Sequence, residues 1–457
     1  MDKRQFLKTS SAFVTGTLLS QVTKATGQAS STSPAEPVAH ETNWAGNLRY
    51  HADHMYAPHS VEEVQQAVRK CAKLRALGSR HSFNTIADSQ SNQISLTHLD
   101  SIELDSNAHT VTVGAGVRYG TLAPVIDAKG FAVHNLASLP HITVAGAIAT
   151  ATHGSGVKNG NLATAVRALE FVNSYGEIVQ VSRDTDGDRF LGSVVALGSF
   201  GIVTKVTLDV QPRFDMTQVV YRNLSMNELE HNLETIMGSG YSVSLFTDWQ
   251  GHKINQVWIK RRVQSGEHHD IAAEFYGAKR ATENMHPIDG HSAVNCTEQM
   301  GVPGPWYERM PHFKMNFTPS SGAELQTEYF VPRNRGYEAI LAVEELKDQI
   351  TPHLFVTEIR AIAADELWMS MAHKRDSLAI HFTWKPETPE VHAVLPLIEA
   401  KLAPFQARPH WAKVFTIPPA NIGKLYERSG DFQTLLKQHD SMAKFRNEFI
   451  DQNIFNA

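Results

Sequence analysis

The chain has few cysteines: Cys71 and Cys296 are the two in 457 residues, and they lie far apart in the sequence. This scarcity excludes both a CxxC metal site and a framework of disulfides. One disulfide between them remains possible. We expect instead that Cys71 is a buried, inert thiol, because it recurs at helical spacing with the apolar residues before it.

Long apolar runs and long basic runs are also missing. The apolar stretch at residues 12–19 is shorter than the roughly 20 residues that a membrane-spanning helix needs, so we expect no membrane anchor. A net charge of -5 without a Lys/Arg run argues against a nucleic-acid partner. With 42% hydrophobic residues, the chain can bury large cores in two or more domains.

The N-terminus resembles an export signal. Lys3 and Arg4 precede the apolar stretch, and small residues follow before Ser30, so residues 1–29 are expected to be removed. The KRQFLK string is close to a twin-arginine signal with lysine at the first arginine position, and the Sec route also stays open. We therefore expect a periplasmic or secreted protein, with residues 30–40 as a polar leader.

The rest of the chain mixes helix and strand patterns. Ser60 and Glu63 form a capping box that starts a helix, and Pro212 ends a strand at a candidate domain boundary. In the first part we expect strands at 110–115 and 202–210, a helix at 121–129 and a hairpin at 168–181. In the second part we expect strands at 256–263, 324–331, 355–361 and 379–384 and a helix at 337–350.

Two glycine-bearing segments lack the usual nucleotide-binding signatures. Neither residues 77–84 (LGSRHSFN) nor residues 138–156 (SLPHITVAGAIATATHGSG) contain GxGxxG or GxxxxGK[ST]. Each lies between strand-like runs, and its glycines leave backbone N–H groups open to an anion or a flat ring. The pair therefore predicts a dinucleotide site of another type.

With these two segments, the chain resembles the vanillyl-alcohol-oxidase type of FAD flavoproteins, in particular the aldonolactone-oxidase branch that contains alditol and xylitol oxidases. The resemblance runs from about Asn43 to the C-terminal KFRNEF string. It implies an α+β chain with a PCMH-type FAD-binding domain at 41–213, an α+β substrate domain at 214–412, and a C-terminal return at 413–457. We expect a monomer.

The same resemblance implies how FAD is held. It makes His81 the residue bonded covalently to FAD, a role that suits a neutral imidazole nitrogen held in a rigid turn. No cysteine in the second segment offers another attachment. Ala137 is implied to lie where O2 approaches. The other residues implied around FAD are Gly78, Ser79, Arg80, Ser82, Phe83, Ser138, Thr143, Gly146, Thr150, Ala151, Thr152, His153, Ile202 and His410.

Two predicted strands carry polar pairs with a period of two. Glu358 and Arg360 are two residues apart in VTEIRAI, as are His381 and Thr383 in AIHFTW, so each pair shares one face of a strand. Such a face is either solvated or lines a polar cavity. The pattern by itself favours a solvated face.

The resemblance reverses that preference. It implies that Ser138, Glu358, His381 and Thr383 bind a polyhydroxylated substrate together with Arg360 and Lys413, and that the two cations act in catalysis by stabilising negative charge on the flavin. The implied reaction oxidises a terminal CH2OH of xylitol, sorbitol or another alditol, with O2 reduced to H2O2.

Two other functions stay open. One is an aldonolactone oxidase or dehydrogenase, and the other, of a different class, is a non-catalytic flavin- or carbohydrate-binding protein. We expect no metal: His268, His269 and Asp270 lie together in a polar loop, but no second ligand cluster with metal-site spacing accompanies them.

Overall fold

The computed structural model describes residues 36–37, 41–263, 271–317 and 323–456. The predicted signal, most of the leader and the His268–Asp270 loop lie outside these residues. Residues 34–457 form one compact unit, and the predicted domain boundaries within it stay predictions. None of the helices in the described residues combines the length and apolar character needed to cross a lipid bilayer.

Among the described residues, the N-terminal half contains two larger sheets and a two-stranded sheet formed by β7 (Phe131–Ala132) and β11 (Gln211–Pro212). Strands β1 (Glu36–Pro37), β2 (His54–Tyr56), β4 (Asn92–Ser95) and β3 (Arg75–Leu77) form the first in that order. The second is antiparallel, in the order β5 (Ile102–Asp105), β6 (Thr110–Gly114), β10 (Ile202–Asp209), β8 (Val166–Val172), β9 (Ile178–Ser182). The predicted strands and hairpin of this half are confirmed.

Helices of this half begin close to where the sequence predicts. The Ser60 hydroxyl accepts a hydrogen bond from the backbone N–H of Glu63 and caps α1 (Val61–Lys70). Helix α2 spans Tyr119–Asp127 and α3 spans Val144–Ala149. Cys71 follows the last turn of α1 as its C-cap, and it is buried and free, as is Cys296. The two thiols therefore form no disulfide.

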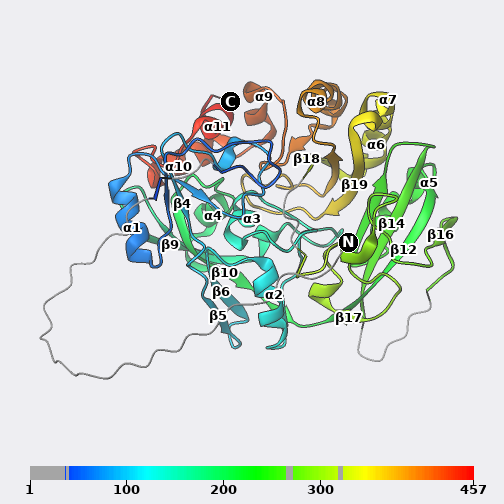
Figure 1. The fold of residues 1–457 in the computed structure, drawn as a ribbon, viewed down its shortest axis with the longest axis horizontal. Coiled ribbons are helices and arrows are strands. Elements are labelled where there is room, and N and C mark those ends of the chain that lie inside the picture. The colour runs from blue at the N-terminus through cyan, green and yellow to red at the C-terminus, as the bar shows by residue number, and fades with distance from the viewer. Residues whose placement is uncertain (1–35, 38–40, 264–270, 318–322, 457) are drawn as a thin grey trace, which may run out of the picture. The chain divides into compact units, whose positions relative to one another are not determined.

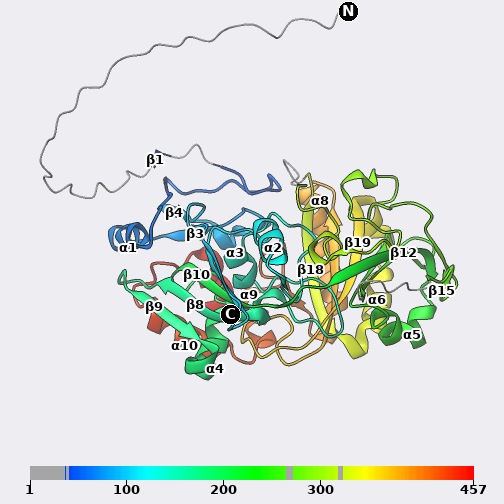
Figure 2. The same ribbon diagram turned by 90° about the horizontal axis from the view of Figure 1, so that it is seen from below.

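The C-terminal half is built on a large antiparallel sheet that comprises ten strands among the described residues. Its order is β15 (Glu274–Phe275), β16 (Ala278–Arg280), β12 (Asp215–Ser225), β14 (Lys253–Val263), β13 (Ser242–Thr247), β19 (Leu354–Ile362), β20 (Ser377–Trp384), β18 (Leu325–Pro332), β21 (Arg408–Pro409), with β17 (Gly304–Pro305) beside β12. Figure 2 shows this sheet and the five-stranded sheet in different parts of the unit.

Helices cover one face of the large sheet (Figure 1). They are α5 (Glu228–Met237), α6 (Gly336–Glu344), α7 (Lys347–Ile350) and α8 (Thr388–Leu402). The predicted helix at 337–350 is broken between α6 and α7, although Val343, Leu346 and Ile350 all stay in the same core. The hydrophobic pattern thus predicted correctly which residues are buried, but it was wrong in predicting one continuous helix.

The C-terminal segment returns to the N-terminal half. It carries α9 (Pro419–Ile422), α10 (Ser429–His439) and α11 (Glu448–Ile450), and α10 packs against α4 (Arg183–Val194). The Arg75 guanidinium, at the end of β3, donates to the carbonyl of Phe445 (2.6 Å). The C-terminal segment is therefore bonded to β3, the strand that leads into the first glycine-bearing segment.

Candidate functional site

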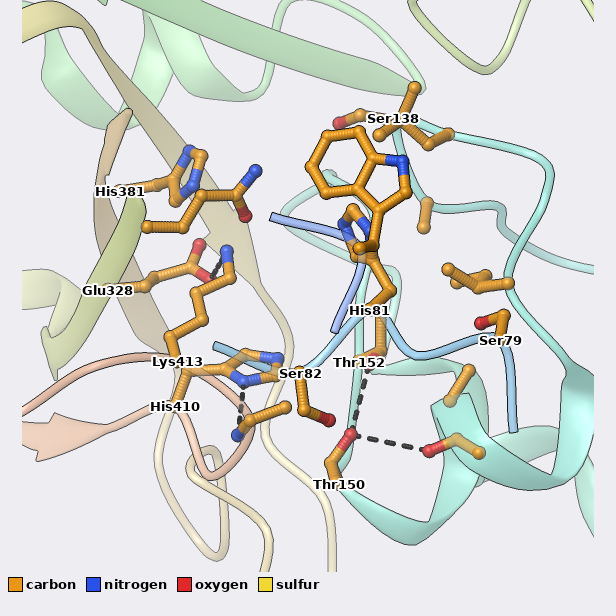
Figure 3. Close-up of a pocket in the computed structure, with 18 of the residues that line it drawn as sticks. Ser79, His81, Ser82, Ser138, Thr150, Thr152, Glu328, His381, His410 and Lys413 are labelled. Atoms are coloured by element: carbon orange, nitrogen blue, oxygen red, sulfur yellow. Dashed lines mark hydrogen bonds and ion pairs between the residues drawn. The ribbon is translucent and has the colours of Figure 1, made fainter. Parts of the chain in front are cut away.

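A cavity of about 510 Å³ lies between the two glycine-bearing segments and the face of the large sheet opposite helices α5 to α8. Its loop wall consists of Trp44, residues 78–82 and the segment 137–153, of which some residues, among them His141 and Ala151, do not themselves line the cavity. Its sheet wall consists of Glu328, Glu358, Arg360, His381, Thr383, His410 and Lys413. Figure 3 shows His81 on the loop wall opposite Glu328, His381 and Lys413.

Most of the predicted site residues line this cavity, although they come from distant parts of the chain. They are Gly78, Ser79, Arg80, His81, Ser82, Ala137, Ser138, Thr143, Gly146, Thr150, Thr152, His153, Glu358, Arg360, His381, Thr383, His410 and Lys413. Phe83, Ala151 and Ile202 do not line it. Their side chains are buried in hydrophobic cores, Ile202 together with Val64 and Ile94. The expected contact between the backbone of Ile202 and FAD is compatible with this burial and stays a prediction.

His81 stands on the loop wall among aromatic rings and carries no charge. Its Nδ1 lies 3.2 Å from Nε2 of His141, and the Trp44 ring centroid is 4.5 Å away. Burial holds the pKa of His81 well below its ordinary value, and His141 and Lys413 lower it further. A neutral imidazole results, which keeps a nitrogen lone pair for bonding to an electrophile.

The two segments of the loop wall approach each other closely because both use glycine. A Cβ atom at Gly78 of the first segment would come within 2.7 Å of the Thr143 hydroxyl oxygen of the second, and one at Gly146 would come within 2.8 Å of the same oxygen inside the second segment, both closer than side chains tolerate. Arg80 takes the left-handed conformation (φ 62°), which turns the chain immediately before His81. Bare backbone therefore faces the cavity, and it fits the flat rings and diphosphate of FAD.

The sheet wall is polar because three neighbouring strands direct matching residues to one face. In the antiparallel register, His381 of β20 lies opposite Glu328 of β18 and opposite Glu358 of β19. The pattern-based expectation of a solvated face was wrong: Glu358 and Arg360 are 4% and 5% exposed. The loop wall, which comes from another part of the chain, covers them.

Glu328 is the carboxylate that pairs with both cations of the sheet wall, Arg360 and Lys413. Its side chain is fully buried, and it accepts hydrogen bonds from Arg360 Nη2 (2.6 Å) and Lys413 Nζ (2.7 Å). Burial would raise its pKa, but Lys413, His153 and Arg360 hold that pKa well below its ordinary value. The carboxylate thus stays ionised and fixes both cations.

Glu358 is held in a similar way. Its Oε1 lies 2.7 Å from Nε2 of His312, and its Oε2 lies 3.6 Å from Nε of Arg360. These neighbours lower its pKa despite burial. Arg360 also reaches the loop wall through Ser138 Oγ (3.5 Å).

Some buried polar atoms of the sheet wall have no hydrogen-bond partner among the described residues. Among the described residues, Nε2 of His381 and Nε of Arg360 make no hydrogen bond. Unsatisfied buried donors and acceptors are costly, so atoms of this kind indicate a ligand in the cavity. The sheet wall therefore fits a molecule that carries several hydroxyl groups.

Sequence reasoning missed three buried residues here: Glu328, Lys260 and His312. Glu328 had a usable signal, because Gln326 and Glu328 are two residues apart in LQTEYFVP, the same period as the pairs on β19 and β20. His312 lies in a loop and had none.

One group of residues could hold a metal ion by spacing. The ligand atoms of His153, Glu328 and His410 lie within 4.8 Å of one another. However, both carboxylate oxygens of Glu328 already accept from cations, Arg360 and Lys413. Two fixed positive charges beside the group disfavour a metal cation there.

Known proteins match the chain in both halves. The FAD binding domain family matches residues 52–182, and the D-arabinono-1,4-lactone oxidase family matches residues 319–453. Cholesterol oxidase from B. sterolicum superposes with a TM-score of 0.70 at 14% identity, covering 90% of this chain and 96% of that one. Glucooligosaccharide oxidase from Acremonium strictum gives 0.70 at 14% identity, covering 90% and 94%.

The fold is thus the predicted PCMH-type FAD-binding fold, and with its site it defines an FAD-dependent oxidoreductase. The chain is 45% identical to alditol oxidase from Streptomyces sp. over 90% of its length and 97% of that protein. L-gulono-1,4-lactone dehydrogenase from Mycobacterium tuberculosis is more distant, at 25% identity over 89% of this chain and 97% of that one. The chain belongs to the alditol oxidase family.

Proposed function

We propose that the protein oxidises the terminal CH2OH of an alditol such as xylitol or sorbitol to the aldehyde and reduces O2 to H2O2. One observation carries this assignment: the sheet wall presents carboxylate, imidazole and hydroxyl groups side by side through Glu358, His381 and Thr383. Each can pair with a hydroxyl group of a polyol. The 45% identity to an alditol oxidase supports the same substrate class.

The balance of charge also favours an uncharged substrate. The wall holds Glu328 and Glu358 against Arg360 and Lys413, and these four groups are joined by contacts of 2.6 to 3.6 Å. A sugar acid would add a buried charge without a free partner, which is costly. A neutral alditol adds none.

FAD, when bound, takes up the two electrons that leave the alcohol carbon and passes them to O2. Arg360 and Lys413 contribute fixed positive charge beside the reacting hydroxyl, which lowers the cost of removing its proton and stabilises negative charge that develops in the transition state. Glu358 and His381 orient the chain of hydroxyl groups. Because Glu328 holds both cations in place, they need no rearrangement during the reaction.

Covalent attachment of FAD through His81 is part of the proposal. The solved glucooligosaccharide oxidase is described as carrying histidyl-bonded FAD. In this chain the supporting observation is the neutral imidazole of His81 on the loop wall, beside His141. His81 would hold the isoalloxazine ring, and the backbone of the two glycine-bearing segments would hold the rest.

Ala137 is proposed to leave room for O2. It lines the cavity immediately before Ser138, whose hydroxyl contacts Arg360. The Ala137→Val variant should slow reoxidation by O2 more than reduction by polyol, because two added methyl groups narrow the approach. Stopped-flow measurement of both half-reactions checks this, and unchanged reoxidation would remove Ala137 from the proposal.

A peroxide assay on purified protein tests the function directly. The panel pairs xylitol and sorbitol with L-gulono-1,4-lactone and D-arabinono-1,4-lactone, because the lactone families match part of the chain. We expect peroxide with the alditols. Peroxide formed from the lactones alone would replace the proposal with lactone oxidation.

Export through the predicted signal is also part of the proposal. The protein would then work as a periplasmic or secreted monomer. N-terminal sequencing of the protein from its native host checks it, and a mature chain that begins at residue 1 would contradict it.

A further inference from the structure

A histidine contacts Glu358, and a buried lysine contacts that histidine. Lys260, on β14, is 1% exposed, and His312 is 6% exposed. A buried lysine is rare unless its three N–H groups find acceptors. This one therefore calls for an explanation.

The surroundings of Lys260 supply three acceptors. Its Nζ donates to the carbonyl of Met310, to the carbonyl of Pro311 (3.0 Å) and to Nδ1 of His312 (3.2 Å). Burial lowers the pKa of Lys260 to about 7, but the ionised carboxylate of Glu358 beside Nε2 can only accept, so Nδ1 of His312 accepts the hydrogen bond from Lys260. The ring proton of a neutral His312 then lies on Nε2.

That proton points at Glu358. Nε2 of His312 lies 2.7 Å from Glu358 Oε1, whereas the next contacts of the carboxylate, to Arg360 Nε and His381 Nδ1, are 3.6 and 4.0 Å from Oε2. The His312 bond is thus the short contact that sets the plane of the carboxylate and leaves Oε2 toward the other groups of the sheet wall.

His312 itself has little freedom. Its backbone N–H donates to the carbonyl of Ser138 (3.2 Å), and its carbonyl accepts from the N–H of Thr297 (2.9 Å). The rings of Phe246 and Trp258 pack at 5.4 and 5.1 Å. Burial and the neighbouring Lys260 lower the pKa of His312 to about 4, so the ring is neutral at physiological pH.

We propose that Lys260 and His312 are positioning residues for polyol binding: Lys260 fixes the tautomer of His312, and His312 holds the Glu358 carboxylate in the orientation that accepts a substrate hydroxyl. This inference rests on the proposed function, because it takes Glu358 as a ligand of the polyol. It adds two residues, His312 at the edge of the cavity and Lys260 outside its lining, to the residues proposed to bind the polyol.

The test measures reduction of bound FAD by xylitol without oxygen, as a function of xylitol concentration. In His312→Leu the apparent Kd for xylitol should rise about tenfold to a hundredfold, the range for losing one hydrogen bond to a charged group. The limiting rate should stay within about threefold. His312→Gln, whose side-chain amide can donate to Glu358, should recover most of the affinity.

A double-mutant cycle separates positioning from a general structural role. In the Glu358→Gln background, adding His312→Leu should change Kd by less than about twofold, because the carboxylate it orients is gone. Lys260→Met should raise Kd less than His312→Leu does. Lys253→Met, at the other end of β14, is the matched control and should leave Kd unchanged.

The outcomes are distinct. Wild-type protein whose FAD is not reduced by any alditol would overturn the proposed function and this inference together. If the wild type is reduced but His312→Leu keeps the wild-type Kd, or its effect is additive with Glu358→Gln, the inference alone is overturned. Should His312→Leu fail to retain FAD, the same comparison is made with His312→Gln and Lys260→Met, and wild-type affinity in Lys260→Met together with weak binding in His312→Gln would contradict it.

Discussion

The loop wall and the sheet wall of the cavity are both buried, and burial lowers the pKa values of histidines on both, including His381 and His410 of the sheet wall, but the sheet wall also holds buried ions in pairs. On the loop wall, His81 and His141 lose their protons, because burial lowers both pKa values. On the sheet wall, Glu328 and Arg360 stay ionised in contact with each other.

The difference follows from what each group finds nearby. No carboxylate among the described residues pairs with His141, so burial, and to a lesser extent Arg118, favours the uncharged ring. Glu328 has two cations within 2.7 Å, which outweigh its desolvation. A neutral wall suits covalent attachment of a cofactor, and a wall of paired charges suits recognition of a polar, uncharged substrate.

The largest expected effect breaks the loop wall. His81→Ala should abolish covalent attachment, because the proposal assigns the bond to His81 and not to His141, the neutral imidazole beside it. After acid precipitation, the flavin should remain in the supernatant for the variant and in the pellet for the wild type. Ser79→Ala, in the same turn, should keep the attachment. Flavin that stays with precipitated His81→Ala protein would contradict the assignment.

The next effect breaks the sheet wall. Glu328→Gln removes the carboxylate shared by Arg360 and Lys413, and loss of one partner of a buried ion pair costs about 3–5 kcal/mol. We expect the free energy of unfolding, measured by urea denaturation, to fall by about that amount. Glu324→Gln is the control: Glu324 also lines the cavity, but burial raises its pKa, so less charge is lost. Equal losses of unfolding free energy in the two variants would contradict the role of Glu328 as the shared partner of Arg360 and Lys413.

A smaller change tests the chemistry of the sheet wall. Lys413→Met removes one fixed cation, and we expect the limiting rate of FAD reduction by xylitol to fall on the order of a hundredfold, as for loss of one preorganised electrostatic group. Affinity for xylitol should change less than the rate. Anaerobic stopped-flow traces give both values, and a wild-type limiting rate would refute the role of Lys413.

The smallest expected effect is on how the free energy of unfolding depends on pH, which differs for the histidines of the loop wall and the carboxylates of the sheet wall. His141 takes up a proton near pH 6.5 when unfolded and near pH 4 when folded, so the unfolded chain binds more protons between these values and stability falls as pH drops. His141 contributes at most ~1.4 kcal/mol per pH unit to the slope of the unfolding free energy against pH. The carboxylates of Glu328 and Glu358 remain ionised there because their pKa values are lowered. His141→Gln should flatten the slope of unfolding free energy against pH, and parallel slopes would contradict this.

Much of the fold follows from local patterns in the sequence. The capping box at Ser60 and the alternating strands of both halves are all present, and the polar pairs on β19 and β20 do share one face. These features depend on neighbours within a few residues, which a sequence displays directly.

The parts that could not be predicted depend on distant contacts. The polar face looked solvated because the loop wall that covers Glu358 lies some 200 residues earlier in the chain. His312 lies in a loop, whose sequence has no helical or strand periodicity to indicate which side chains are buried. Lys260 looks in the sequence like an exposed strand lysine, and its burial depends on contact with Pro311, a residue 51 positions later in the chain. The break between α6 and α7 likewise lies inside a continuous apolar pattern.

The affinity of the His81→Ala variant for xylitol tests the division between the two walls most directly. The variant, loaded with free FAD, is reduced by xylitol without oxygen, and its apparent Kd is compared with those of the wild type and Glu358→Gln. The account predicts a Kd within about threefold of the wild type, because the residues proposed to bind the polyol lie mainly on the sheet wall and away from His81. A Kd raised as far as in Glu358→Gln would show that His81 itself contributes to polyol binding, and would contradict the account.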